Sequence, residues 1–196
     1  MSAGKWYFFD METLGQSEDA VILSIGISCV THEMKNYTFD QRMRLGYYSK
    51  LNKNQQLPER TVDNSTMDWW KSQGDSAKSV LSSEHCVDVY TVYKQVIEYF
   101  NKTQFDVEQD IIWSRGLIDQ RWWASLCNKT FSKFGPVQDI LPFWRWRDTR
   151  TACDLLVGNP NGHVPSTPEH FIKHNALCDA VMDSIRLHEA AKLYEN

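Results

Sequence analysis

An acidic pair at the end of an aromatic run is the feature that most constrains this chain. Residues 6–13 read Trp-Tyr-Phe-Phe-Asp-Met-Glu-Thr, which places Asp10 and Glu12 two positions apart. The aromatic run predicts a buried strand. Because strand side chains point the same way at every second position, both carboxylates lie on one face. Two such acids raise each other's pKa unless positive charge lies between them, and their oxygens suit Mg²⁺ or Mn²⁺ as ligands.

Partners for this pair occur later in the chain. Asp119 follows a short apolar segment, 111–113, and a small-residue turn, and near the C-terminus His174 precedes Asp179 by five positions. On a helix a five-residue offset leaves two side chains on different faces. We therefore expect His174 to lie in the loop before the last helix, and Asp179 in the first turns of that helix.

Each of these residues has a purely structural alternative. An Asp-x-Glu pair is also typical of solvated strand ends, and Asp119 is a residue type that often caps a helix, here one beginning near position 120. His174 and Asp179 alone would indicate a loop histidine and a first-turn acid that favours the helix dipole. The complete set, in this order, favours the functional interpretation.

The order of these five residues resembles the DEDDh family of 3′→5′ exonucleases. Blocks at 66–73, 113–116 and 143–151 are similar to the branch of that family formed by T-even phage exodeoxyribonucleases and related bacterial exoribonucleases. Together the blocks and the five residues extend over nearly the whole chain. One departure is Ile118, because family members usually place an aromatic residue before this acid. The resemblance implies an α/β fold, an RNase H-like mixed β-sheet flanked by helices.

The resemblance also implies a site for two metal ions, Mg²⁺ or Mn²⁺, about 3.5–4 Å apart. In this interpretation Asp10 bridges both ions, and His174 takes the proton from the attacking water, a role that suits a neutral imidazole. The remaining metal ligands are Glu12, Asp119 and Asp179. The expected activity is hydrolysis of single-stranded DNA, or of 3′ overhangs, to 5′-mononucleotides.

Three other functions remain open from the sequence. They are a 3′→5′ exoribonuclease that trims RNA 3′ overhangs, a catalytically silent nucleic-acid-binding module of the same fold, and a phosphoesterase that acts on small nucleotides. The complete set of five residues argues against the silent module, and the additional tryptophans and arginines favour a polymer. The expected partners are single-stranded DNA or RNA 3′ ends and, as in relatives, a second copy in a homodimer.

Aromatic and apolar residues near the acidic pair are candidates for substrate binding. By resemblance, the backbone at Thr13 approaches the terminal nucleotide and Leu14 wedges against its base, with core packing as the alternative for Leu14. Trp69 and Trp70 are adjacent, so on a helix they point about 100° apart. We expect one of them to anchor the helix in the core and the other to stack on a base.

Three arginines are candidates for phosphate contact, since a guanidinium binds phosphate oxygens bidentately. They are Arg115, Arg147 and Arg150. Arg115 lies four residues before Asp119, which places it at the rim of the expected site. For the other two, a salt bridge to Asp148 is an equally good interpretation.

Other residues with reactive side chains lack partners at ligand spacing. His163, His170 and His188 are interpreted as surface or loop residues, and Cys178 as a core residue. These residues are therefore not candidates for the site.

Composition limits the remaining possibilities. A chain of 196 residues with 42% hydrophobic and 23% charged residues fits one globular domain, 1–196. It contains neither an apolar run of the ~20 residues that a membrane helix needs nor an apolar signal core. Five widely spaced cysteines indicate reduced thiols and a cytoplasmic location. The net charge of −4 argues against a protein that coats nucleic acid, but not against an enzyme that grips a few phosphates.

Apolar periodicity predicts the order of the elements. Strands are expected at 6–13, 21–30, 34–39 and 111–113, and a polar excursion at 52–65. Helices are expected after an N-cap at Ser65 or Thr66, and at 87–102, 120–128, 149–157 and 176–194. Residues 158–169 contain two glycines and three prolines and are expected to form a loop.

Overall fold

The computed structural model describes residues 4–57, 59–162, 164 and 166–194. In this part of the chain a six-stranded mixed sheet has the strand order β4-β3-β2-β1-β5-β6. Neighbours β1, β2 and β3 are antiparallel, whereas β5 is parallel to both β1 and β6, and β4 is parallel to β3. The strands are β1 (Trp6–Thr13), β2 (Ile22–Val30), β3 (Tyr47–Leu51), β4 (Cys86–Val87), β5 (Ile111–Ser114) and β6 (Trp146–Asp148).

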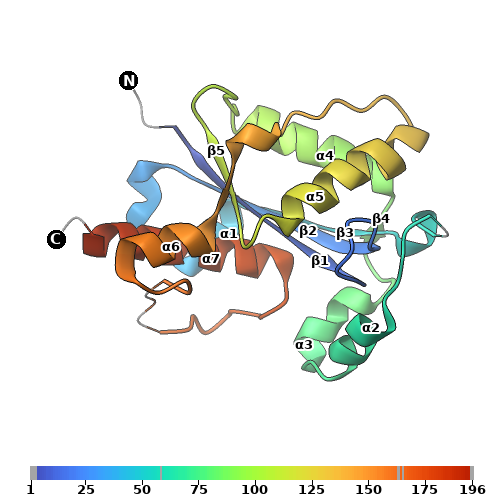
Figure 1. Cartoon of the computed structure of the whole chain (residues 1–196), viewed down its shortest axis with the longest axis horizontal. Coiled ribbons are helices and arrows are strands. Elements are labelled where there is room, and N and C mark those ends of the chain that lie inside the picture. The colour runs from blue at the N-terminus through green and yellow to red at the C-terminus, as the bar shows by residue number, and fades with distance from the viewer. Residues whose placement is uncertain (1–3, 58, 163, 165, 195–196) are drawn as a thin grey trace.

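Helices cover both faces of the sheet, which confirms the expected α/β fold. Helices α4 and α5 pack on one face, and α6 and α7 on the other (Figure 1). Helices α2 and α3 lie together beyond the end of β1. The α-helices are α1 (Phe39–Leu45), α2 (Asn64–Lys71), α3 (Asp75–Lys78), α4 (Val89–Lys102), α5 (Ile118–Ser125), α6 (Thr149–Val157) and α7 (Ala176–Tyr194).

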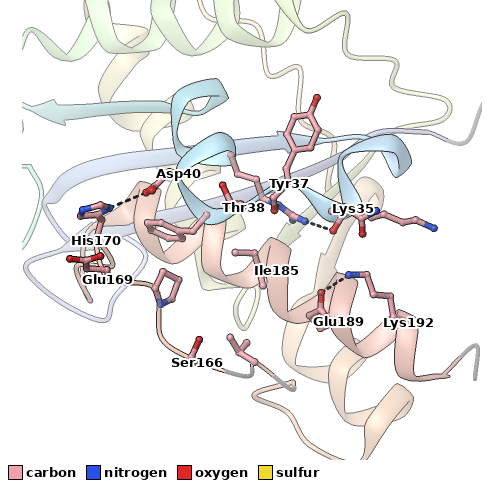
Figure 2. A pocket seen from close by; sticks show the side chains of 15 residues that line it. Lys35, Tyr37, Thr38, Asp40, Ser166, Glu169, His170, Ile185, Glu189 and Lys192 are labelled. Carbon is pink, nitrogen blue, oxygen red and sulfur yellow. Dashed lines mark hydrogen bonds and ion pairs between the residues drawn. The ribbon is translucent and has the colours of Figure 1, made fainter.

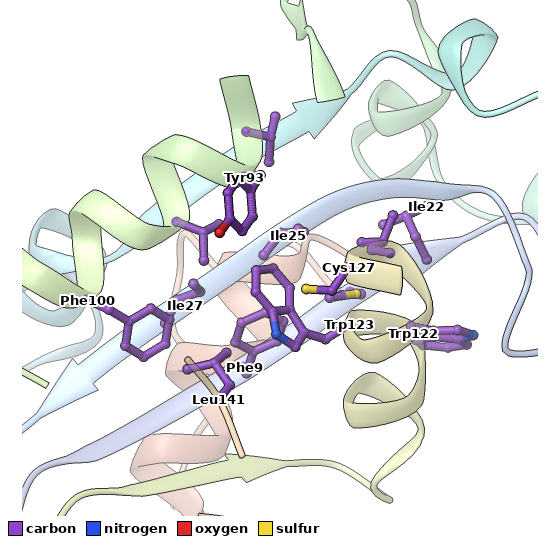
Figure 3. Close-up of a cluster of buried hydrophobic side chains, with 14 of the residues drawn as sticks. Phe9, Ile22, Ile25, Ile27, Tyr93, Phe100, Trp122, Trp123, Cys127 and Leu141 are labelled. Carbon is purple, nitrogen blue, oxygen red and sulfur yellow. The ribbon is translucent and has the colours of Figure 1, made fainter. Parts of the chain in front are cut away.

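Side-chain alternation along β1 sorts its residues between the two helix layers. Tyr7, Phe9 and Met11 enter the core under α4 and α5, where the ring of Phe9 lies edge-on to Trp123, 5.7 Å between centroids (Figure 3). Phe8 packs on the opposite face, against α6 and α7. Asp10 and Glu12 have the same parity as Phe8 and therefore point to the α7 side. The prediction that both acids share one face is confirmed.

Gly26 allows α7 to begin directly on the sheet. It lies opposite Asp10 in the β1–β2 ladder, and a Cβ atom at this position would overlap the backbone of Ala176 and Leu177. The absence of a side chain at Gly26 therefore sets how closely the first turn of α7, and with it Asp179, approaches β1.

We expect Gly26→Ala to lower the free energy of unfolding by about 1–3 kcal/mol, since rigid backbone has to move to make room for the methyl group. The displacement of α7 should also reduce activity at temperatures where the variant is fully folded. Urea unfolding and initial hydrolysis rates measure the two effects. Gly74→Ala is the matched control, because no heavy atom lies within 4 Å of the Cβ built there. Equal stability of the two variants would contradict this role for Gly26.

Several predicted elements differ from the structure. The helix expected at 87–102 begins two residues later, at Val89, because Val87 belongs to β4 and Asp88 is the N-cap. The strand expected at 34–39 is wrong: a 3₁₀ turn, His32–Asn36, leads into α1, whose start is fixed by a capping box between Thr38 and Gln41. The strand that pairs with β2 is instead β3. The N-cap of α2 is Asp63, not Ser65 or Thr66, because its carboxylate accepts from the backbone N–H of Ser65.

A further difference concerns the helix expected at 120–128. It begins earlier, at Ile118, and widens after Ser125 into a π-helical turn, Leu126–Thr130. The helices expected at 149–157 and 176–194 begin and end as predicted. None of the helices in the described part of the chain is both long and apolar enough to span a membrane.

Candidate active site

Five predicted residues from distant parts of the chain line one cavity of about 540 Å³. The end of β1 supplies two acids, the first turn of α5 a third, α7 a fourth, and the turn before α7 the histidine. They are Asp10, Glu12, Asp119, Asp179 and His174. The structure therefore brings together every residue of the predicted acidic set and its histidine.

A tight turn places Asp119 in this cavity. Gly116 and Leu117 adopt positive φ angles of 99° and 56°, which turns the chain sharply from β5 into α5. Leu117 occupies the N-cap position, so Asp119 does not cap the helix. Its Oδ1 instead accepts a hydrogen bond from the backbone N–H of Met11 at 2.9 Å. This bond ties the start of α5 to the strand that carries Asp10 and Glu12.

His174 lies in the turn before α7, as predicted. Its φ of 63° is left-handed, and its backbone N–H donates to Oδ2 of Asp179 at 2.7 Å. Asn175 caps the helix by accepting from the N–H of Cys178. Ligand atoms of Glu12, His174 and Asp179 all lie within 4.8 Å of one another, and Asp10 and Asp119 line the same cavity outside that group.

Burial makes the carboxylate charges costly. It raises the pKa of Asp10 and Glu12 well above the ordinary range, and repulsion from neighbouring acids raises both further. The pKa of Asp119 rises to about 7 and that of Asp179 to about 6, in both cases chiefly through burial. A divalent cation relieves this cost, and clustered carboxylate oxygens are its preferred ligands. The donor set therefore fits the metal ions that the sequence predicts.

The pKa of His174 is shifted in the opposite direction. Burial, and secondarily the charge of Lys173, lower it below the ordinary value for histidine. The imidazole is therefore neutral at neutral pH, which is the form that accepts a proton.

The two adjacent tryptophans differ in burial, as the angle of about 100° between them predicts. Trp70 is fully buried, and its indole N–H donates to the carbonyl oxygen of Thr13 at 2.8 Å. Trp69 is 41% exposed and its ring meets that of His174 edge-on, 4.6 Å between centroids. Trp70 therefore anchors α2, and Trp69 presents an aromatic surface beside the acids.

A second cavity, of about 420 Å³, adjoins the acidic one. Thr13, Trp69 and Trp70 line it, and the two cavities share Met11, Glu12 and Trp122. Together they offer room for a group next to the acids and for a flat ring under Trp69.

Leu14 lines neither of these cavities. Its side chain is buried among Val21, Leu23 and Trp70. This placement favours the core-packing alternative over a wedge against a base.

Of the three predicted phosphate-binding arginines, Arg115 and Arg150 line the acidic cavity. Arg147 does not, because its Nη1 donates to the backbone carbonyls of Trp144 and Trp146. In the described part of the chain, Asp148 forms no ion pair with Arg147 or with Arg150. Its carboxylate instead caps α6 and accepts from the N–H of Gly116.

Sequence reasoning missed other residues of this site. The cavity is also lined by Asn161, Phe171, Lys173 and Arg186, and the charge of nearby Asp183 contributes to the raised pKa of Asp10. Asp183 lies four residues after Asp179, on the same face of α7. Helical periodicity could therefore have identified it.

The predictions for the other histidines have mixed outcomes. His170 is an exposed loop residue, as expected, and His163 lies outside the described residues. The surface assignment of His188 is wrong: it faces inward from α7, stacks on Trp6 and accepts from Nη1 of Arg42 at 2.9 Å. Burial lowers its pKa to about 4. Cys178 is buried, as predicted.

A further cavity, of about 510 Å³, lies between α1, α7 and the loop that carries His170 (Figure 2). Several of its polar side chains are already paired: His170 with Asp40 at 3.3 Å, and Lys192 with Glu189 at 2.6 Å. None of the predicted site residues lines it, so it is separate from the acidic site.

Comparison with known proteins gives concordant results. A family model described as the 3′-5′ exoribonuclease Rv2179c-like domain matches residues 5–190. The exodeoxyribonuclease of Enterobacteria phage T4 is 24% identical over 201 residues, covering 95% of this chain and 88% of that protein. The crystal structure of cell-death related nuclease 4 (CRN-4) is similar with a TM-score of 0.53 at 10% identity. That alignment covers 97% of this chain but 64% of the other, and it supports the fold alone.

Proposed function

The chain belongs to the family of 3′-5′ exoribonuclease Rv2179c-like domains and is a DEDDh-type 3′-5′ exonuclease, and from this premise we propose that it degrades single-stranded DNA, including 3′ overhangs, to 5′-mononucleotides. The observation that carries the proposal is the convergence of Asp10, Glu12, Asp119, Asp179 and His174 on one cavity. The name of the phage T4 relative, an exodeoxyribonuclease, supports DNA as the substrate.

RNA is the second candidate substrate, because the matching family is described by an exoribonuclease activity. A protein distinguishes the two polymers by a contact to the 2′-hydroxyl. The proposed active site is the same for both substrates, so a direct comparison of the rates at which DNA and RNA are shortened decides between them.

Enzymes of this family depend on divalent metal ions, and we assign two ions, Mg²⁺ or Mn²⁺, to this site. The four carboxylates of Asp10, Glu12, Asp119 and Asp179 would hold them. When bound, such ions neutralise charge on the phosphate and the leaving oxygen and promote ionisation of water. His174 acts as the general base that accepts the proton of the attacking water, for which its lowered pKa suits it.

The remaining predicted residues hold the substrate in this proposal. The backbone at Thr13 contacts the terminal nucleotide, and the hydrogen bond from Trp70 fixes that backbone. Trp69 stacks on the terminal base, while Leu14 supports the contact from the core. Arg115 and Arg150 bind phosphate at the cavity. Arg147, outside the cavity, meets the strand further from its 3′ end.

We assign the whole chain, 1–196, to a single exonuclease domain, and the homodimer remains a prediction. Light scattering of the purified protein at several concentrations checks the second point. A constant monomer mass would contradict it.

The central test is the shortening of labelled oligonucleotides. Single-stranded DNA and RNA of one sequence, each with a 5′ label, are incubated with the protein in Mg²⁺, Mn²⁺ or EDTA. We expect ladders that shorten from the 3′ end, faster for DNA, with no shortening in EDTA and none when a 3′ inverted nucleotide blocks the end. Faster shortening of RNA would select the second candidate. Hydrolysis that persists in EDTA would reject the metal-dependent mechanism.

A further inference from the structure

The acidic cavity also has a basic wall. Arg115, Arg150, Lys173 and Arg186 line it together with the four predicted metal-binding acids. Yet in the described part of the chain no ion pair joins any of these cations to Asp10, Glu12, Asp119 or Asp179. Opposite charges in one cavity attract each other strongly. The structure must therefore hold the basic side chains back from the acids.

Asp183 holds two of them. Its side chain, 7% exposed, projects from α7, and one oxygen, Oδ1, accepts from Nη1 of Arg115 at 3.1 Å and from Nη1 of Arg186 at 2.6 Å. Nη2 of Arg115 also donates to Oδ1 of Asn161. These contacts connect the turn after β5, the loop after α6, and α7. Two guanidinium groups that would otherwise repel each other are fixed side by side.

The basic side chains of the cavity have N–H groups that are available to a ligand. A guanidinium carries five N–H groups. In the part of the chain that the structure describes, Nε of Arg115 and both Nε and Nη2 of Arg186 have no acceptor, and the side chains of Arg150 and Lys173 form neither a hydrogen bond nor an ion pair. Such a set of cationic donors fits an anion with several oxygens, of which the phosphodiester is the one that a nucleic-acid strand provides.

The same geometry argues that Asp183 is not a further metal ligand. Two guanidinium groups already donate to its Oδ1, whereas in the described part of the chain no guanidinium donates a hydrogen bond to the four acids of the metal site. The cluster of Asp183 with its two arginines carries a net positive charge, and both arginines line the same cavity as the acids.

We infer that Asp183 is a positioning residue that holds Arg115 and Arg186 as a clamp for a backbone phosphate of the bound strand. This inference rests on the proposed nuclease function. In it the acids hold the metal ions, and the two arginines of the clamp hold the strand in the same cavity. The clamp sets affinity for the polymer, and Asp183 acts only through the two arginines.

The test measures binding without turnover, in an Asp10→Asn background and in the presence of Mg²⁺. Fluorescence anisotropy of a 5′-labelled single-stranded oligonucleotide gives Kd at several salt concentrations. We expect Arg186→Gln and Asp183→Asn to weaken binding by roughly tenfold and to reduce the slope of log Kd against log salt by about 0.7, the value of one phosphate contact on a single strand. Arg186→Lys, which keeps the charge, should retain most of the slope.

Arg44→Gln, an exposed change on α1 with the same loss of charge, is the matched control and should leave the slope unchanged. Oligonucleotides with one neutral methylphosphonate linkage then identify the contacted phosphate. At one position the linkage should weaken binding by the parent protein but neither by Arg186→Gln nor by Asp183→Asn. If Asp183 had a merely structural role, the linkage at that position would weaken binding by Asp183→Asn as much as by the parent protein. If Asp183→Asn does not fold, the two Arg186 variants decide the question.

Two results separate this inference from the proposed function. If both clamp variants bind like the Arg44→Gln control while the wild type shortens DNA in Mg²⁺, the clamp is wrong and the nuclease function stands. If the wild type shortens neither DNA nor RNA, the proposed function fails and the clamp fails with it. In the catalytically active background the clamp predicts a raised KM with a smaller change in kcat.

Discussion

Asp10→Asn is expected to abolish nuclease activity, with a loss of more than ~10³-fold in kcat, the scale on which a single electrostatic stabiliser contributes. Asparagine keeps the shape of the side chain but removes a negative charge from the centre of the proposed metal site. Shortening of a labelled strand in Mg²⁺ measures the loss. Asp154→Asn, an exposed change on α6, controls for the altered charge. Retention of more than a tenth of the wild-type rate would remove Asp10 from the metal site.

The same substitution should stabilise the metal-free fold at neutral pH. The folded-state pKa of Asp10 is raised by burial and by the neighbouring acids. A carboxyl group with a raised pKa favours the fold below its unfolded value, and this contribution is lost as pH rises through the folded value. In EDTA, Asp10→Asn should therefore melt above the wild type at pH 8, with a smaller difference at pH 4. Added Mn²⁺ should raise the melting temperature of the wild type far more than that of the variant.

The sequence predicts best where one local rule decides the structure. Alternation along 6–13 identifies the face that Asp10 and Glu12 share, because the strand is buried on both sides and its register cannot slip. The five-residue offset between His174 and Asp179 requires a loop followed by a helix, and that is their arrangement. The acidic site is thus largely readable from local geometry and family resemblance.

The sequence predicts the structure less well where contacts between residues far apart in the chain determine it. Segment 34–39 has the apolar content of a strand, but the capping box at Thr38 selects a helix and β3 takes the place beside β2. The closeness of α7 to the sheet depends on Gly26, whose neighbour in space is Ala176. No local pattern marks such a contact.

Local sequence patterns do not reveal networks of charged residues either. In the sequence Asp183 is one more acid of the last helix, and its proposed function depends on two arginines, one 68 residues before it and one three residues after it. His188 likewise is buried because Arg42 and Trp6 lie against it. In both cases the residue types are visible in the sequence, whereas the partners that define their roles come from other elements of the fold.

His174→Ala is expected to slow hydrolysis by ~10²–10⁴-fold, the usual contribution of a general base. His170→Ala is the matched control, since it removes an exposed histidine four residues away whose partner, Asp40, lies outside the acidic site. Single-turnover rates with enzyme in excess measure the chemical step. Because burial lowers the pKa of His174, the rate of the wild type should begin to fall only below pH 6.5, as His174 becomes protonated. The variant should lack this part of the pH dependence.

The position of His174 also allows a second role, and the variant separates the two. Its ring nitrogen lies within 4.8 Å of ligand oxygens of Glu12 and Asp179, so it is placed to bind a metal ion as well as to accept a proton. A general base can be removed without change in metal affinity, whereas loss of a ligand weakens it. Titration of Mn²⁺ into His174→Ala, followed by thermal shift, should therefore give the wild-type affinity. A weaker affinity, together with a rate that returns to the wild-type value at saturating Mn²⁺, would assign His174 to metal binding and leave the proton to another acceptor.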